Sequence, residues 1–138
     1  MVAVGNCNVG IDIEENQKDM HCLFRAVLSR NEKGLVEQMN GDKAADFFVI
    51  TWTLKEAYSM MTGIGLSKKF IELDVSYFGD GISISDRDDL IKTCCIVQKK
   101  FKDTYWCSVC VEGINSFFCS ATEVSFQEIM RWAMKSQE

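Results

Sequence analysis

Apolar residues recur at steps of three and four along residues 42–62, which is the spacing of one face of an α-helix. Phe48 and Trp52 widen this face, so that only a thin polar stripe remains around the helix. A helix that is apolar over most of its circumference is normally buried. We therefore expect a buried central helix here, with Gly63 as its C-terminal stop. Residues 47–54 are also rich in aromatic and β-branched side chains, so a buried strand is the alternative interpretation of that part.

Two elements are expected ahead of the central helix. Alternation of apolar residues with Gly and Asp over residues 9–13 predicts a short strand. Residues 16–30 carry apolar side chains at helical spacing, which predicts an amphipathic helix. Asp42 is then the expected N-cap of the central helix, because its carboxylate can accept from backbone N–H groups of the first turn.

A first hairpin–helix unit is expected after the central helix. Residues 70–78 alternate between apolar and polar side chains, as a half-buried strand does. The glycines at 79–81 suit a tight turn, and residues 82–84 suit a short return strand. Residues 85–102 begin with acidic and end with basic side chains around an apolar stripe, which predicts a helix.

A second unit of the same kind is expected to follow. Residues 105–111 predict a strand and residues 116–122 predict its return. Ser125 and Glu128 have the spacing of a capping box, which predicts the start of a C-terminal helix. The whole pattern predicts one α+β domain over residues 1–138, in which a small antiparallel sheet of two hairpin–helix units packs with the buried central helix and the N-terminal amphipathic helix.

Composition and charge narrow the functional classes. The apolar content of 47% can build a core without metal or disulfides. The formal net charge is -5 and the sequence pI is about 4.9, so the overall field repels nucleic acid and anionic membranes. Neither a signal peptide nor an apolar run of membrane-spanning length is evident. We therefore expect a cytoplasmic protein, with a nuclear location as the alternative, and no membrane partner.

Seven cysteines are many for this length, and their odd number leaves one thiol over in any closed disulfide framework. Free cysteine thiols in a reducing compartment are therefore expected. Trp106 with Cys107 and Cys110 resembles the Trp-Cys-x-x-Cys motif of thioredoxin-like oxidoreductases, but the pair lies inside an alternating strand and not at a helix start. Cys107, Cys110 and Cys119 are the candidate ligands in an alternative hypothesis of a zinc-dependent or thiol-dependent protein.

No catalytic motif is evident, so we expect no catalytic residue and no cofactor. Whether the chain is an enzyme is left open, and a protein without enzymatic activity is favoured. His21 is the only histidine, and it has no adjacent nucleophile that it would face. The acidic residues between Asp74 and Asp89 do not have EF-hand spacing, and helix capping or solvation explains them.

Basic side chains support a second alternative, an RNA-binding protein. Lysines before and after the first expected hairpin could share one edge, with Tyr105 and Trp106 nearby to stack on bases. The final residues superficially resemble the end of a double-stranded RNA-binding domain, but the basic run at the start of the last helix is replaced by Ser125 to Glu128. The lysines of this hypothesis are Lys68, Lys69, Lys99, Lys100 and Lys102.

The favoured hypothesis is a non-enzymatic protein-interaction or regulatory module, such as an adaptor. A homodimer is one form that this module could take. It rests on the surplus of large apolar side chains in a chain without a cofactor motif. Trp132 falls off the apolar stripe of the last helix, and Trp106 lies on the opposite strand face from Tyr105. These three aromatic residues are the candidate contacts with a protein partner of unknown identity.

Overall fold

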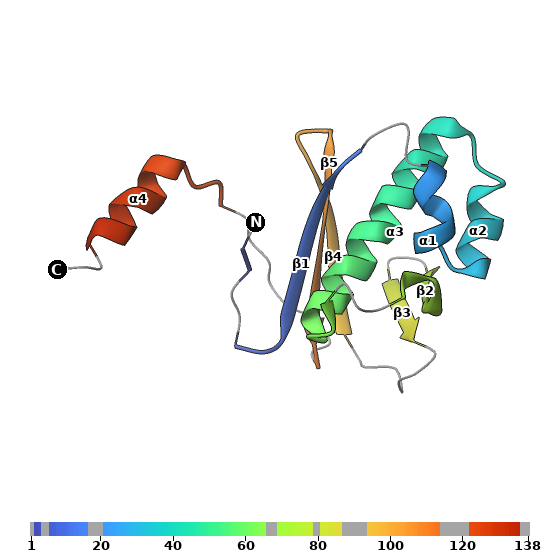
Figure 1. Ribbon diagram of the computed structural model, residues 1–138, viewed down its shortest axis with the longest axis horizontal. Helices are drawn as coiled ribbons and strands as arrows, with labels where there is room; N and C mark the ends of the chain where they lie inside the picture. The colour runs from blue at the N-terminus through green and yellow to red at the C-terminus, as the bar shows by residue number, and fades with distance from the viewer. Residues whose placement is uncertain are drawn as a thin grey trace.

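The computed structural model describes residues 2–3, 6–16, 21–65, 69–78, 81–86, 94–113 and 122–135. Its centre is a three-stranded antiparallel sheet of β1 (Val9–Glu15), β5 (Tyr105–Glu112) and β4 (Cys94–Phe101), in the order β1-β5-β4. The long helix α3 (Gly41–Met61) packs on one face of this sheet (Figure 1). The fold is therefore α+β, as the sequence predicts.

The central helix is confirmed as α3, and the alternative of a strand inside it is wrong. Its N-cap is Asn40, two residues before the expected Asp42, because the side chain of Asn40 and not that of Asp42 accepts from the backbone N–H of Lys43, at 3.4 Å. After its C-cap at Thr62 the chain turns at Gly63, whose φ of 76° suits a glycine. Buried residues occur on all sides of the helix, as expected for a central element.

The remaining elements lie mainly around one side of α3 (Figure 1). The 3-10 turn η1 (His21–Leu23) leads into α1 (Phe24–Val27), and α2 (Arg30–Val36) follows. A second 3-10 turn, η3 (Phe70–Glu72), precedes the hairpin of β2 (Leu73–Phe78) and β3 (Gly81–Asp86). The last helix, α4 (Phe126–Lys135), lies apart from the sheet and the other helices (Figure 1).

Two predictions about the second half of the chain need correction. The helix expected over residues 85–102 is instead strand β4 from Cys94 onward, paired along its whole length with β5. Its β-branched and aromatic residues suit a strand, and pairing with a neighbouring strand overrides the helical pattern of charges. Residues 87–93 lie outside the described part of the chain. The single sheet expected from the two hairpin–helix units is also wrong, because β2 and β3 form a sheet separate from that of β4 and β5.

The neighbour of β5 on its other side is β1, from the opposite end of the chain. The return strand expected over residues 116–122 lies almost entirely outside the described residues. The helix expected over residues 16–30 is interrupted, because Leu28 is extended and Ser29 caps a new helix in a capping box with Glu32. The capping box at the start of α4 is confirmed: Ser125 N donates to Glu128 Oε2 at 2.8 Å, and Glu128 N donates to Ser125 Oγ at 3.3 Å.

A fully buried ion pair fixes α3 against the smaller elements. Lys55 Nζ donates to Glu32 Oε2 at 2.5 Å and to the carbonyl oxygens of Val27 and Phe70, both at 2.9 Å. Glu32 also accepts from the backbone N–H of Val75 at 2.8 Å. One pair of charges thus joins α1, α2, α3, η3 and β2.

Candidate functional site

Three carboxylates meet where β1 crosses α3. Asp12 and Glu14 are two residues apart on β1, so their side chains lie on the same face of the strand. Glu56 belongs to the thin polar stripe of α3. One carboxylate oxygen from each of these residues lies within 4.8 Å of the other two, and among the described residues this is the only such group of His, Cys, Asp or Glu side chains.

A glycine allows the strand and the helix to come this close. A Cβ atom on Gly10 would lie 1.8 Å from the carbonyl oxygen of Ala57 and 2.5 Å from the backbone nitrogen of Met61. Gly10 shares its strand face with Asp12, and Ala57 directly follows Glu56. The close backbone approach at Gly10 therefore sets the distance across which the three carboxylates face one another.

The carboxylates are electrostatically unfavourable without a counter-charge. Burial raises the pKa of Asp12 to about 7, and the nearby charges of Glu56 and Glu14 add to this effect. Burial, and then the charge of Glu56, also raises the pKa of Glu14. In the part of the chain that the structure describes, the buried Oδ2 atom of Asp12 has no hydrogen-bond partner. An unpaired buried oxygen beside two further carboxylates fits a hard divalent cation such as Mg²⁺ or Mn²⁺, which takes oxygen ligands.

An indole ring holds one of these carboxylates. Trp52 Nε1 donates to Glu56 Oε1 at 2.6 Å, one helical turn along α3. The ring of Trp52 packs edge-on against that of Phe48, which stacks on Phe24. The cluster of aromatic rings therefore continues up to the carboxylate site.

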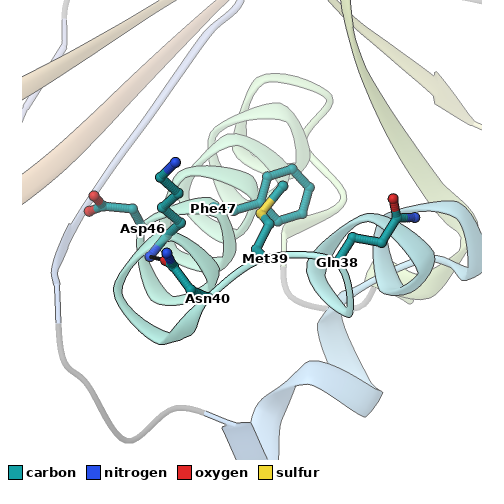
Figure 2. A pocket seen from close by; sticks show the side chains of 6 residues that line it. Gln38, Met39, Asn40, Asp46 and Phe47 are labelled. Atoms are coloured by element: carbon teal, nitrogen blue, oxygen red, sulfur yellow. Dashed lines mark hydrogen bonds between the residues drawn. The ribbon is translucent and has the colours of Figure 1, made fainter.

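A separate surface pocket of about 640 Å³ opens at the other end of α3. Figure 2 shows Asn40, Asp46 and Phe47 on the first turns of the helix, with Gln38 and Met39 on the segment before it. Asp46 precedes Glu56 by ten residues, which corresponds to about 15 Å along the axis of the helix. The pocket and the carboxylate site are therefore distinct.

The three aromatic residues expected to face a partner have different surroundings. Trp106 lies on the face of β5 that meets α3, packs against the cluster around Phe48, and donates from Nε1 to Asp46 Oδ1 at 3.1 Å. Tyr105 lies on the opposite face of β5 and is 37% exposed. Trp132 falls within α4, but its side chain lies outside what the structure describes. A partner-binding role of these residues stays a prediction.

The two candidate zinc ligands that the structure describes, Cys107 and Cys110, are not brought together. Cys110 belongs to the core beneath α3, whereas Cys107 belongs to the cluster on the other face of the sheet, as their strand positions predict. Burial raises the pKa of the Cys110 thiol well above its ordinary value. Cys119 lies outside the described residues. None of the six described cysteines is in a disulfide.

The lysines of the RNA-binding hypothesis are mostly engaged with other side chains. Lys100 Nζ lies 3.8 Å from Asp46 Oδ1 and also over the ring of Trp106. Lys102 Nζ lies 3.3 Å from Glu123 Oε1, and Lys69 Nζ lies 3.6 Å from Glu72 Oε1. Lys99 lies over the ring of Phe101. Lys68 lies outside the described residues.

The sequence analysis missed all three carboxylates of the site. A signal was present, since Asp12 and Glu14 alternate with apolar residues on a predicted strand, and Glu56 is a charged residue within an unusually apolar helix. Neither pattern matches a known metal-binding motif, and the acids considered for a metal site lie elsewhere, between Asp74 and Asp89. Convergence of the site depends on how β1 packs on α3, which no local pattern encodes.

Comparison with known proteins identifies the family. Residues 8–122 match the family model described as "4'-phosphopantetheinyl transferase superfamily". A 4'-phosphopantetheinyl transferase of Bacillus subtilis is 25% identical over 129 residues, which are 93% of this chain and 57% of that protein. The 4'-phosphopantetheinyl transferase Sfp of Bacillus subtilis strain 168 is 25% identical over 122 residues, which are 88% of this chain and 54% of that protein. This chain therefore spans little more than half the length of either transferase.

Proteins nearer to this chain in length match it in sequence or in fold. A holo-[acyl-carrier-protein] synthase of Bacillus mycoides is 26% identical over 103 residues, which are 67% of this chain and 87% of that protein. The crystal structure of a holo-(acyl-carrier-protein) synthase from Bacillus anthracis, in complex with CoA (3',5'-ADP), superposes with a TM-score of 0.66 at 21% identity and covers 76% of this chain and 94% of that chain. The synthase of Plasmodium yoelii superposes with a TM-score of 0.62 at 17% identity and covers 78% and 95%.

These findings correct the functional hypothesis. The interpretation of the chain as a regulatory, adaptor or protein-binding module is wrong, because most of its length matches a family of transferases. The RNA-binding and thiol or zinc alternatives fit no better. No described helix is long and apolar enough to cross a membrane. From the match over residues 8–122, this chain belongs to the 4'-phosphopantetheinyl transferase superfamily.

Proposed function

We propose that this protein transfers a 4'-phosphopantetheinyl group from coenzyme A to an acyl carrier protein, using a divalent cation held by Asp12, Glu14 and Glu56. The observation that carries this proposal is the convergence of three carboxylates, with an unpartnered buried oxygen, in a chain of this superfamily. The substrates come from the names of the relatives, one of which is a holo-acyl-carrier-protein synthase and another a structure with CoA (3',5'-ADP).

The proposed reaction is a phosphoryl-type transfer. A hydroxyl oxygen of the acceptor protein forms a new bond to the phosphorus that bears the pantetheine. The bond from that phosphorus to the bridging oxygen of the pyrophosphate breaks, 3',5'-ADP leaves with the electron pair, and the hydroxyl proton is released. A Mg²⁺ ion held by Asp12, Glu14 and Glu56 would supply the neutralisation of charge on the pyrophosphate that chemistry of this kind needs.

The chain's own groups bind and orient in this proposal. Asp12 and Glu14 are set by the strand ladder, in which they lie opposite Ser108 and Trp106 of β5. Glu56 approaches from the helix. A cation binds carboxylates in their ionised form, so its binding displaces the proton that the raised pKa of Asp12 favours.

The proposed reaction also gives an identity to the protein partner, which the sequence alone left unknown. An acyl carrier protein becomes the expected protein partner, and the divalent cation replaces the expectation that there is no cofactor. The homodimer and the cytoplasmic location stay predictions.

The test combines transfer and cation dependence. Purified protein is incubated with CoA, Mg²⁺ and an apo-acyl carrier protein, and mass spectrometry of the carrier should show the addition of one phosphopantetheinyl group. Glu56→Gln or a chelator should abolish the addition, whereas Asp46→Asn, at a carboxylate outside the trio, should retain it. Absence of any addition to a panel of apo-carriers, by protein that binds Mn²⁺, would overturn the proposed activity.

A further inference from the structure

We propose that Trp52 is a positioning residue that fixes the carboxylate of Glu56 for cation binding, an inference that rests on the cation site of the proposed function. The indole Nε1 of Trp52 donates to Glu56 Oε1 at 2.6 Å. The two residues are four apart on α3, so their side chains are neighbours on the helix surface.

Glu56 is the one carboxylate of the trio that lacks a strand ladder to hold it. Asp12 and Glu14 have short or strand-anchored side chains whose backbone is fixed in register with β5. A glutamate on a helix has three side-chain torsions, and ordering it costs conformational entropy. The hydrogen bond from Trp52 fixes one of the two carboxylate oxygens, and so restricts the rotation of the group.

Trp52 is itself held rigidly enough to do this. Its ring meets that of Phe48 edge-on, with centroids 5.4 Å apart and planes inclined at 67°. Phe48 is fully buried, and its ring stacks on Phe24 with centroids 4.6 Å apart. The indole position is thus set by the core before any cation arrives.

The chemistry of the donor also suits a cation site. An indole N–H is a donor only and carries no charge. A lysine or arginine in this place would hold Glu56 equally well but would repel a divalent cation. Outer hydrogen bonds of this kind orient metal ligands, and their loss typically lowers metal affinity by about 10-fold to 100-fold.

Cation affinity measures this role directly, without substrates. Binding of Mn²⁺ to the purified protein is followed by electron paramagnetic resonance for the wild type, Trp52→Phe and Glu56→Gln. Trp52→Phe should weaken binding by about 10-fold to 100-fold, and Glu56→Gln should weaken it further. Trp106→Phe is the matched control, because it also removes an indole N–H near the site. Trp106 lies opposite Glu14 in the strand pair of β1 and β5, but its N–H donates to Asp46, which is not one of the three carboxylates. Its affinity should equal that of the wild type.

The outcomes separate the two proposals. If the wild type does not bind Mn²⁺, the cation site itself is overturned and the role of Trp52 falls with it. If the wild type binds and Trp52→Phe binds equally well, or Trp106→Phe loses as much affinity, the role of Trp52 alone is overturned. Should Trp52→Phe fail to fold, a benzothiophene analogue of tryptophan at position 52 keeps the ring and removes only the N–H. The same loss of affinity is expected from it, and unchanged affinity would overturn the inference.

Discussion

Gly10 of β1 lies directly against the backbone of Ala57 in α3, so closely that a Cβ atom on Gly10 would stand 1.8 Å from the carbonyl oxygen of Ala57. Backbone atoms of a helix cannot move aside as the end of a flexible side chain can. This contact therefore fixes the separation of the strand from the helix, and with it the spacing of Asp12 from Glu56.

Replacement of Gly10 by alanine should force β1 away from α3. We expect a loss of stability on the order of 1–3 kcal/mol, as for overpacking of a core, together with weaker Mn²⁺ binding. Urea denaturation and a Mn²⁺ titration measure the two effects.

Gly34→Ala is the control, since a Cβ there meets nothing within 4 Å and Gly34 lies inside α2. Alanine in a helix is favoured over glycine by roughly 0.5–1 kcal/mol, so this variant should be more stable. Equal stability of the two variants would contradict the close contact.

The metal-free protein should become less stable as pH rises from about 4 to 7. The pKa of Asp12 is about 7 in the folded chain against an ordinary value of 3.8, so the folded state binds more protons than the unfolded state over this interval. A group with a raised folded-state pKa contributes stability at low pH that is lost as pH rises through that pKa.

Melting temperatures across this interval, in the presence of a chelator, provide the measurement. Asp12→Asn should flatten the dependence, and Mg²⁺ should restore stability at neutral pH because it binds only the folded site. A wild-type profile indistinguishable from that of Asp12→Asn would show that the pKa of Asp12 is not raised in the folded protein.

Removal of the Lys55 charge should be among the most damaging single changes. Lys55→Met leaves the fully buried carboxylate of Glu32 without its cation, which typically costs about 3–5 kcal/mol. The double change Lys55→Met with Glu32→Gln should recover part of this loss, because the uncompensated charge is gone. Lys69→Met is the control at an exposed pair, Lys69 with Glu72, and should cost about 0–1 kcal/mol. Urea denaturation measures all three, and comparable losses at both lysines would argue against the buried pair.

Thiol reactivity should divide the cysteines by exposure. Cys7 and Cys22 are exposed and should react promptly with a thiol reagent in the native protein. Cys107 and Cys110 are buried, and burial raises the pKa of Cys110, so both should react only after denaturation. Alkylation followed by peptide mass spectrometry gives the order of labelling. Early labelling of Cys110 would contradict its place beneath α3.

Local patterns predicted the local elements of this fold. The apolar run of α3, the alternation of β1 and the capping box at Ser125 are each encoded by neighbouring residues, and the structure confirms them. Strand β4 was predicted as a helix, because its pairing with β5 is not visible in its own charge pattern.

The site was missed for a related reason. Asp12 and Glu56 are 44 residues apart in sequence, and they meet only because β1 joins the sheet beside β5 and lies across α3. The prediction of a regulatory module rested on a surplus of large apolar side chains. Two of these, Trp52 and Trp106, instead donate to carboxylates on α3.

The face of β1 that meets α3 carries Gly10, Asp12 and Glu14, while its apolar residues Val9, Ile11 and Ile13 lie in the cluster on the other face. The strand thus places acids where a core would ordinarily have hydrophobic side chains. Selection for thermal stability in a medium without divalent cations would favour apolar replacements at Asp12 and so discard the proposed cation site. A stability-guided redesign of this protein should therefore be carried out with a divalent cation present, since the proposed activity and resistance to heat favour opposite residues at this position.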